Sequence, residues 1–386
     1  MSVESYDVAI VGSGPAGSAA ALALEQCRLR VALIDKSRFP RDKICGDALS
    51  PDTVNQLFKL SKTLGEDFLR NQNKGETRAV KLISPSGYQT ELEFASRGLK
   101  GYVMPRVHFD HLLQSHAVRS TGVTTIFEPL TDVRHTGNGV ELKLKSGRSV
   151  LCQMVVGADG ANSAVRRLMH PSGFDENHHC AGLRCYFSNV DGFSNNNAIE
   201  LHFFKNLLPG YFWIFPLADN KANVGLGMLS SAARKRKVNL KKLLFDLIEH
   251  EPALRRRFKH AKSQEKVRGF GLPLGGVKRS ISGDRYLLTG DAAWLINPLS
   301  GEGIANAIRS GRIAARHIAA CFDSGRFDAE FNSNYDQMIY DAMWNEFRIN
   351  SLLQRTLRSP AICELTFKYA LGFKPVQQWI MSGFNV

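Results

Sequence analysis

The stretch Tyr6-Asp7-Val8-Ala9-Ile10-Val11-Gly12-Ser13-Gly14-Pro15-Ala16-Gly17 decides the fold. It joins an apolar run, typical of a buried strand, to three glycines spaced as G-x-G-x-x-G. An Ala- and Leu-rich segment up to Cys27 follows and is predicted to be a helix, and a second apolar strand over 30–34 ends at Asp35. Because strand, turn, helix and acid all fall within the first 35 residues, we predict a βαβ unit that binds a dinucleotide.

The glycine spacing has a physical reason in such a unit. The first glycine permits the tight turn, the second lets the backbone approach a pyrophosphate, and the third lets the helix lie close to the sheet. The free amides of the helix N-terminus face the phosphate, and the acid accepts hydrogen bonds from a ribose. The flanking strand, helix and acid disfavour the alternative of a glycine-rich turn without a ligand. The expected cofactor contacts here are Gly12, Gly14, Pro15, Ala16, Gly17, Asp35 and Lys36.

Two later segments also combine a buried strand with glycine and aspartate. One runs from Met154 to Asp159-Gly160, and the other runs from Tyr286 to Gly290-Asp291 and on to Gly301-Glu302-Gly303-Ile304. They resemble the "DG" and "GD" segments of the flavoprotein monooxygenases and their reductase relatives. The resemblance implies that the dinucleotide is FAD.

The same resemblance implies where FAD would lie. It places Asp291 at the ribityl chain and the amides from Gly301 to Ile304 at the isoalloxazine ring, where a helix N-terminus stabilises the negative charge of a reduced flavin. Arg106 resembles the arginine that lies along the cofactor in this family. The cofactor contacts implied in these segments are Arg106, Asp159, Gly290, Asp291, Pro298, Gly301, Gly303 and Ile304.

Two further motifs narrow the resemblance. Tyr211-Phe212-Trp213-Ile214-Phe215-Pro216, followed by Gly225-Leu226-Gly227, matches Y-x-W-x-F-P and G-x-G of the geranylgeranyl reductase family. The segment 40–51 resembles that family's loop, which carries a Cys-Gly pair beside the flavin, here Cys45-Gly46. The resemblance covers about residues 5–320. Asp47 departs from it, because many members have a small residue there.

The resemblance implies an α/β fold: a Rossmann-like FAD-binding domain, similar to that of para-hydroxybenzoate hydroxylase, with an inserted β-rich substrate domain and a C-terminal helical segment. We expect residues 1–75, 106–175 and 280–340 to form the FAD-binding domain. Residues 76–105 and 176–279 are expected to form the substrate domain, and 341–386 the helical region. Within the substrate domain, one amphipathic helix is predicted from about Asn239 to Lys259.

The predicted activity is the reduction of carbon–carbon double bonds in an isoprenoid lipid by hydride from reduced FAD. Such an alkene is apolar, so its site must exclude water and offer aromatic walls. Tyr211, Trp213 and Phe215 alternate along one strand and therefore face the same side. They could be ordinary sheet core, but the resemblance favours a substrate wall. With Cys45 and Gly46, which also belong to the expected cofactor contacts, they are the expected catalytic residues.

Several alternatives stay open. A flavin-dependent monooxygenase or halogenase has the same fold; halogenases resemble W-x-W-x-I-P in the matching strand, where Trp213 and Pro216 agree but Tyr211 and Phe215 do not. A lipid-binding peripheral membrane protein without catalysis is a further possibility. No second G-x-G-x-x-G unit follows a strand, so NADPH would dock transiently or another donor would supply the electrons.

Composition limits the partners. The chain has 386 residues, 44% of them hydrophobic, and 50 Lys and Arg against 36 Asp and Glu give a net charge of +14. This charge favours anionic cofactors, membrane surfaces or nucleic acid as partners. The basic clusters at 234–237 and 255–257 lack the aromatic residues of a nucleic-acid motif, so no nucleic-acid partner is expected. The seven cysteines lack the spacing of a disulfide scaffold, and no signal peptide is visible, so we expect a cytoplasmic protein, either free or peripheral to the membrane. The sequence does not indicate the oligomeric state.

Two local features complete the expectations. His178-His179-Cys180 and Cys185 do not have the spacing of a standard zinc site, and no metal is expected. The last forty residues read as helices that mix apolar and basic residues, which suits peripheral contact with a membrane or a cap on the substrate domain. The apolar residues are Leu352, Leu353, Leu357, Leu365, Phe367, Phe373, Trp379, Ile380 and Phe384, and the basic ones are Arg355, Arg358, Lys368 and Lys374.

Overall fold

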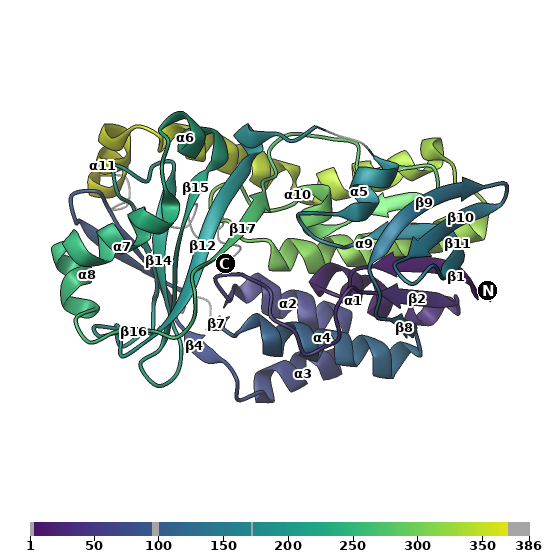
Figure 1. Ribbon diagram of the computed structural model, residues 1–386, viewed down its shortest axis with the longest axis horizontal. Coiled ribbons are helices and arrows are strands. Elements are labelled where there is room, and N and C mark those ends of the chain that lie inside the picture. Colours follow the sequence, from purple (N-terminus) through teal and green to yellow (C-terminus); the bar gives the residue numbers. More distant parts are fainter. Residues whose placement is uncertain (1–3, 95–99, 171–172, 370–386) are drawn as a thin grey trace.

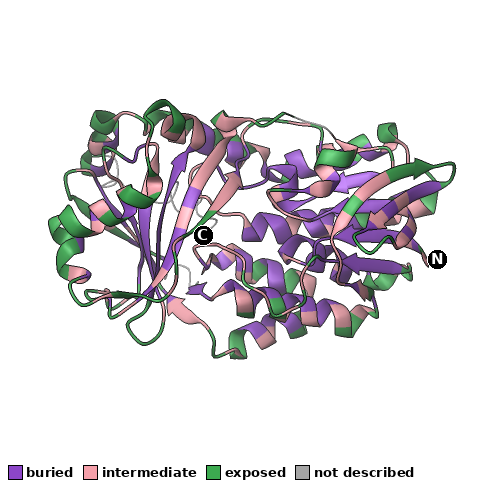
Figure 2. Cartoon of the chain, viewed as in Figure 1, coloured by how far each residue is buried: buried purple, intermediate pink, exposed green. Residues whose placement is uncertain are grey.

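The computed structural model describes residues 4–94, 100–170 and 173–369. Two large sheets lie at opposite ends of its long axis, with helices packed around each (Figure 1). Buried residues follow both sheets and the inner faces of the helices (Figure 2). The α/β fold class expected from the sequence is therefore confirmed.

The first sheet contains the βαβ unit predicted from the first 35 residues. Its central strands run in the order β19-β11-β1-β2-β8 and are all parallel, and β18, β10 and β9 add antiparallel pairs. The bounds are β1 (Glu4–Val11), β2 (Val31–Ile34), β8 (Thr124–Ile126), β9 (Leu130–Thr136), β10 (Gly139–Leu144), β11 (Ser149–Gly157), β18 (Ser282–Gly283) and β19 (Tyr286–Leu288). Segments far apart in sequence thus meet side by side, with their carboxyl ends at one edge.

Helices cover this sheet and bring the expected motifs together. α1 lies against α9, and a Cβ on Gly311 of α9 would come 2.3 Å from the carbonyl oxygen of Ala16 of α1, so the two backbones touch. The helices are α1 (Pro15–Ala23), α2 (Pro51–Leu60), α3 (Lys62–Arg70), α4 (Arg106–Thr121), α5 (Ala164–Met169), α9 (Ile304–Ser324) and α10 (Ala329–Thr356). Short 3-10 turns are η1 (Glu25–Cys27), η3 (Glu176–His178) and η4 (Gly290–Ala293).

The second sheet is formed mainly by the β-rich part of the chain. Its order is β16-β12-β15-β14-β13-β5-β6, with β17 paired to β12. The bounds are β5 (Ala79–Ile83), β6 (Gln89–Glu93), β12 (His179–Ser188), β13 (Ile199–His202), β14 (Gly210–Pro216), β15 (Ala222–Leu229), β16 (Lys262–Ser263) and β17 (Arg268–Pro273). The early strand β5 pairs in parallel with β13, so residues from the first quarter of the chain complete this sheet.

A small third sheet lies between the two large ones. It has the order β3-β7-β4, with β3 (Ala48–Leu49), β4 (Gly75–Thr77) and β7 (Gly101–Val103). β3 begins at Ala48, directly after Asp47, so this sheet anchors the end of the Cys-Gly loop. α6 (Ser230–Lys235), α7 (Leu240–His250) and α8 (Pro252–Arg257) cover one face of the second sheet, and Cys363 and Phe367 of α11 (Pro360–Tyr369) pack on the other.

Two helix predictions need correction. The single helix predicted from Asn239 to Lys259 is wrong: α7 ends at His250 and α8 starts at Pro252. Proline lacks an amide hydrogen and disfavours helical conformation in the preceding residue, here Glu251, whose backbone is extended. The helix predicted to reach Cys27 ends at Ala23 and gives way to η1.

Candidate functional site

The first glycine-rich turn has the geometry of a phosphate cradle. Gly14 caps α1 without any side-chain hydrogen bond, which leaves the first amides of the helix available to a ligand. Gly12 has φ +102°, and a Cβ there would lie 2.3 Å from the oxygen of Ala158. A Cβ on Gly17 would lie 1.8 Å from the oxygen of Gly12. Only glycine fits at the first and third positions.

Asp35 holds this turn in place. One carboxylate oxygen accepts a hydrogen bond from the amide of Ser13 at 2.8 Å and the other accepts from Ser37 at 2.9 Å, while Arg41 lies 3.7 Å away. A carboxylate has about four acceptor positions, so capacity is left for a ribose. Lys36, the next residue, is exposed.

Asp159 in the second segment serves its own helix. It accepts hydrogen bonds from the hydroxyl of Ser163 and from the amides of Ala164 and Val165 at the start of α5. Burial raises its pKa, although these hydrogen bonds oppose the rise. Its role is visible as a helix cap. Contact with a cofactor stays a prediction for this residue.

The third segment meets the first. Gly290 has φ +56°, and a Cβ there would lie 3.2 Å from the Cβ atoms of Ala16 and Ala307. Gly303 caps α9, again without a side-chain hydrogen bond, so the amides that open α9 are also available. Asp291 lies between these turns and pairs with Lys43 at 3.4 Å. Pro298 accepts a hydrogen bond from Gln354 of α10 through its carbonyl oxygen.

Arg106 opens α4 and lies next to the Cys45 side chain. It forms two hydrogen bonds to Asp110, at 2.6 and 2.9 Å, and is buried. Burial alone would lower its pKa, but Asp110 and the neighbouring Cys45 side chain raise it overall. Arg41 adds a further contact to Asp110 at 3.1 Å. Arg106 therefore stays charged and fixes the loop, and its predicted contact with a cofactor is not addressed by these bonds.

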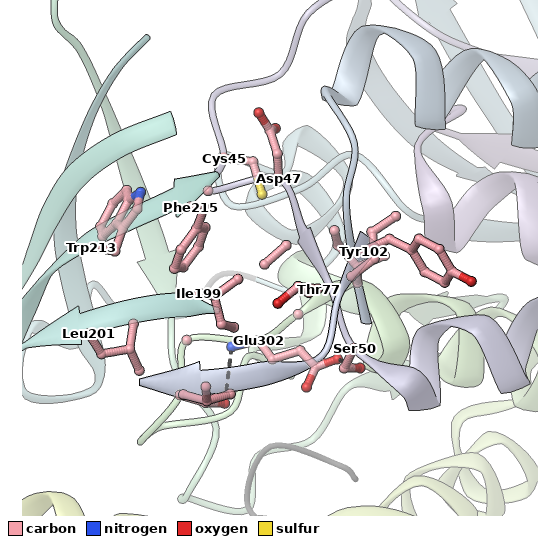
Figure 3. A pocket seen from close by; sticks show the side chains of 18 of the residues that line it. Cys45, Asp47, Ser50, Thr77, Tyr102, Ile199, Leu201, Trp213, Phe215 and Glu302 are labelled. Carbon is pink, nitrogen blue, oxygen red and sulfur yellow. Dashed lines mark hydrogen bonds between the residues drawn. The ribbon is translucent and has the colours of Figure 1, made fainter. Parts of the chain in front are cut away.

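The Cys-Gly loop meets the aromatic strand β14. A Cβ on Gly46 would lie 2.7 Å from the ring of Phe215, so only glycine permits this contact. Tyr211, Trp213 and Phe215 lie on one side of β14, with neighbouring ring centroids 6.2 and 6.0 Å apart. Figure 3 shows Cys45, Trp213 and Phe215 around the same space.

The G-x-G motif on the neighbouring strand serves Trp213. Gly225 pairs with Trp213 across β14 and β15. A Cβ on Gly225 would lie 2.3 Å from the indole ring and 2.1 Å from the carbonyl oxygen of Leu183 on β12. The glycine therefore makes room both for the largest side chain of the wall and for the neighbouring strand, which gives the motif a physical reason.

These elements line a cavity whose empty volume, including the part that opens to solvent, is about 900 Å³. It extends from the Cys45 loop to the N-terminus of α9, and apolar or aromatic side chains form most of its wall. The lining residues are Cys45, Gly46, Asp47, Ala48, Leu49, Ser50, Thr77, Val80, Phe94, Tyr102, Ile199, Leu201, Tyr211, Trp213, Phe215, Phe270, Leu272, Ser300, Gly301, Glu302, Gly303 and Ile304. A second cavity, of about 600 Å³, shares Tyr211, Trp213, Leu272 and Gly301 with it.

The donor set fits FAD. Two helix N-termini without side-chain caps, those of α1 and α9, meet at Ala16, Gly290 and Ala307, which suits one extended anionic ligand. The family described as "FAD binding domain" matches residues 5–337. The chain belongs to this family. It is an FAD-dependent oxidoreductase of the geranylgeranyl reductase type, as its relatives show.

Curated relatives of this flavoprotein include two kinds of reductase. A "Menaquinone reductase" of Mycobacterium tuberculosis (strain ATCC 25618 / H37Rv) is 32% identical, covering 82% of this chain and 77% of that protein. A "Digeranylgeranylglycerophospholipid reductase" of Methanosarcina acetivorans is 29% identical, covering 88% of this chain and 81% of that protein. The resemblance to the geranylgeranyl reductase family is thus confirmed.

Solved structures agree with the fold. A geranylgeranyl bacteriochlorophyll reductase-like protein of Thermoplasma acidophilum has a TM-score of 0.83 at 26% identity, covering 94% of this chain and 91% of that one. The halogenase PltM, in complex with phloroglucinol and FAD, has a TM-score of 0.78 at 17% identity, covering 93% and 78%. The halogenase likeness shows the fold alone.

Some residues of the flavoprotein's site carry no motif in the sequence. Val80, Ile199 and Leu201 line the cavity from short strands whose partners are far away in the chain. Alternation along β13 could have indicated that Ile199 and Leu201 share a face, but not which face. Asn223, which hydrogen-bonds to the Cys45 loop, also carries no motif.

Other expectations concern metal and membrane. In the described ranges, no group of three His, Cys, Asp or Glu residues is arranged to hold a metal ion. His178 pairs with Asp175, and His179 with Ser230.

Among the residues that the structure covers, no helix is long and apolar enough to cross a bilayer. All seven cysteines of the flavoprotein are unpaired.

The apolar and basic residues of the C-terminal helices differ in their exposure, and contact with a membrane stays a prediction. Phe367 is buried against the second sheet, whereas Leu352, Leu365 and the basic residues Arg355, Arg358 and Lys368 are exposed. Phe373, Lys374, Trp379, Ile380 and Phe384 lie outside the described residues.

Proposed function

We propose that this flavoprotein reduces carbon–carbon double bonds in the isoprenoid chain of a membrane lipid. The observation that carries the proposal is the cavity itself, because its aromatic and aliphatic wall runs from the Cys45 loop to the N-terminus of α9. Relatives named for digeranylgeranylglycerophospholipid and for menaquinone support a polyprenyl lipid as substrate. We leave the head group open between these two.

We propose that the three glycine turns hold FAD in the way the sequence predicts. The α1 N-terminus with Gly12, Gly14 and Gly17 would hold the pyrophosphate, and Asp35 the ribose. Asp291 and the amides that follow Gly301 would hold the flavin end. When bound and reduced, FAD supplies the hydride.

The protein's own residues would orient and dry the alkene. Trp213 and Phe215 form one wall and exclude water, which favours a neutral carbon chain over a polar substrate. Reduction of one double bond takes a hydride at one alkene carbon and a proton at the other, and bound reduced FAD would supply the hydride. NADPH or another two-electron donor would supply electrons to the FAD.

The test uses the purified holoenzyme, reduced chemically and kept free of oxygen. It is incubated separately with digeranylgeranylglycerophospholipid and with menaquinone, and the lipids are analysed by mass spectrometry. The proposal expects two added hydrogens per reduced double bond in at least one lipid, located in the isoprenoid chain by fragmentation so that reduction of the quinone ring is not counted, while flavin becomes oxidised. Unchanged lipids at full FAD occupancy would reject it. In a parallel incubation with oxygen, a lipid modification that occurs only in that sample would instead support the monooxygenase or halogenase alternative.

Membrane contact is a separate proposal. The exposed residues of the C-terminal helices include Leu352, Leu365 and Tyr369 as well as Arg355 and Lys368, a mixture that suits the surface of an anionic bilayer. Co-sedimentation with anionic vesicles should fall when Leu352 and Leu365 are both changed to Ser. Equal binding of the variant and the original protein would remove this role.

A further inference from the structure

Asp47 lies directly after the Cys-Gly pair in an unusual conformation. Its φ is +69°, a left-handed value that is uncommon outside glycine and that aspartate tolerates better than most residues. Its carbonyl oxygen accepts a hydrogen bond from the amide of Met104 at 3.0 Å. Its side chain is completely buried. A left-handed backbone and a buried carboxylate both cost free energy, so this residue is expected to have a specific role in the wall of the cavity.

The carboxylate of Asp47 is only half satisfied. Oδ2 accepts hydrogen bonds from the amide nitrogen of Asn223 at 2.7 Å and from the hydroxyl of Tyr186. Oδ1 has no hydrogen-bond partner among the described residues. Figure 3 shows the carboxylate turned away from Ser50 and Glu302 at the far side of the cavity. The hydrogen bonds of the Asp47 carboxylate therefore go to Asn223 and Tyr186 of the protein.

Asn223 transmits the position of Asp47 to both sides of the site. Its Nδ2 donates to Asp47 and, at 2.8 Å, to the carbonyl oxygen of Cys45. Its Oδ1 accepts from the indole nitrogen of Trp213 at 3.0 Å. Two acceptors at one end fix which way the amide points, because a flipped amide would place its oxygen against both of them and its NH₂ against the indole N–H.

We propose that ionised Asp47 is a positioning residue, which acts through Asn223 to hold the Cys45 main chain and the Trp213 indole in the arrangement that the reaction requires. The role in reaction rests on the proposed function. The arrangement itself does not, so it is testable without substrate.

The surroundings of Asp47 make it titratable. Burial raises its pKa to about 6, against the lowering effect of Tyr186, Asn223, Arg184 and Arg106. Tyr186 and Arg184 approach from β12, Asn223 from β15 and Arg106 from α4; the Cys45 thiol lies on the same loop. Both arginines already have carboxylate partners. Arg184 pairs with Asp42 and Glu265, and Arg106 with Asp110.

Two variants separate charge from shape. Asp47→Asn keeps an acceptor toward Asn223 and Tyr186 and tolerates the left-handed backbone, but it cannot ionise. Tyr186→Phe removes a hydrogen bond that lowers the pKa of Asp47, so the midpoint of its titration should rise. Asp47 is ionised above its pKa, so the positioned state gains population as the pH rises through about 6.

The experiment follows the Trp213 indole N–H by NMR in the ¹⁵N-tryptophan-labelled holoenzyme, with the resonance assigned from Trp213→Phe. We expect its shift to titrate with a midpoint near 6, to become independent of pH in Asp47→Asn and to move to higher pH in Tyr186→Phe. The other tryptophan resonances serve as internal controls. A Trp213 resonance that ignores pH in this range, or that titrates unchanged in Asp47→Asn, would overturn the proposal.

Turnover of the lipid gives a second readout. We expect kcat to rise with pH through the same midpoint, and Asp47→Asn to abolish this limb and to lower kcat about tenfold at neutral pH, with FAD retained. If Asp47→Asn does not fold, the shifted limb of Tyr186→Phe tests the same claim. A limb that stays at the same pH in Tyr186→Phe would contradict it. Failure of the lipid reaction itself would leave the NMR result standing and would reject only the proposed function.

Discussion

The two sides of the cavity are built by different means. On the side of the first sheet, glycines decide the geometry: a Cβ on Gly12, Gly17 or Gly311 would meet backbone atoms within 2.3 Å. On the side of the second sheet, aromatic side chains form the wall: a Cβ on Gly46 would meet the ring of Phe215, and a Cβ on Gly225 would meet the ring of Trp213 as well as the carbonyl oxygen of Leu183. The first side is a rigid backbone cradle, whereas the second is a surface of side chains.

This difference indicates how each side responds to change. A side chain added to the cradle has to displace backbone, so binding of the cofactor and stability should fall together. A side chain added to the aromatic wall displaces other side chains, which have alternative rotamers. Substitutions there should affect the lipid reaction more than the cofactor.

The largest effect is expected for Gly17→Ala. Its Cβ would overlap the oxygen of Gly12, so we expect a loss of about 3 kcal/mol in the free energy of unfolding and loss of bound FAD. Gly137→Ala is the matched control, because its Cβ would meet nothing within 4 Å. Thermal unfolding and flavin content of the purified proteins measure both effects. Equal flavin content in the two variants would break the comparison.

A smaller effect, of another kind, is expected for Gly46→Ala. Its Cβ would press on the ring of Phe215, so the loop or the wall must shift. We expect FAD to be retained and lipid turnover to fall about 10- to 100-fold. The double variant Gly46→Ala with Phe215→Leu removes the pressing ring and should recover part of the turnover. No recovery, or loss of FAD in the single variant, would contradict this account of the wall.

A partly buried carboxyl group on α10, that of Glu346, makes the stability of the fold depend on pH. It accepts a hydrogen bond from Asn297 at 2.6 Å, and burial raises its pKa from 4.5 to about 6. The folded protein therefore binds more protons than the unfolded chain between these values, so this group lowers stability as pH rises from 4.5 to 6, by about 2 kcal/mol in all.

Glu346→Gln should remove that loss. The variant should gain stability over the original protein above about pH 6 and match it more closely near pH 4.5, without changing the pH profile of lipid turnover. Thermal unfolding across this range measures the difference. A constant difference at every pH would show that burial of this carboxyl does not matter.

The smallest effect is expected for Tyr211→Phe. The hydroxyl of Tyr211 donates to the carbonyl oxygen of Ser300, which links the aromatic wall to the turn at the N-terminus of α9. Loss of one such hydrogen bond costs about 1 kcal/mol, and we expect about fivefold weaker FAD binding. The exposed Tyr88→Phe serves as the control, and flavin fluorescence gives both affinities. Unchanged affinity would separate the wall from the cofactor turn.

The same contrast explains what the sequence could predict. The βαβ unit and the three glycine turns could be predicted because the backbone of such turns has no room for a side chain. Glycine is therefore required at fixed spacings, as at Gly12 and Gly17. The shared face of Tyr211, Trp213 and Phe215 could be predicted from alternation. The break at Pro252 also had a sequence signal, which the helical periodicity around it outweighed.

The remaining parts depend on long-range pairing. Strand β5 reaches β13 across more than a hundred residues, and no local pattern indicates that Val80 and Leu201 would line one cavity. Asp159 matched the motif, yet its visible partners are the first residues of α5. Asp47 differed from the expected pattern, but only the position of Asn223 shows what its carboxylate does.

A crystal structure of the FAD-bound protein would test the central claim most directly. The account predicts one FAD whose pyrophosphate lies at the N-terminus of α1 and whose isoalloxazine ring lies between the Gly301–Ile304 turn and the Cys45 loop, with one face open to the apolar cavity. An isoalloxazine ring outside this space, or a ring separated from the cavity by the aromatic wall, would contradict it.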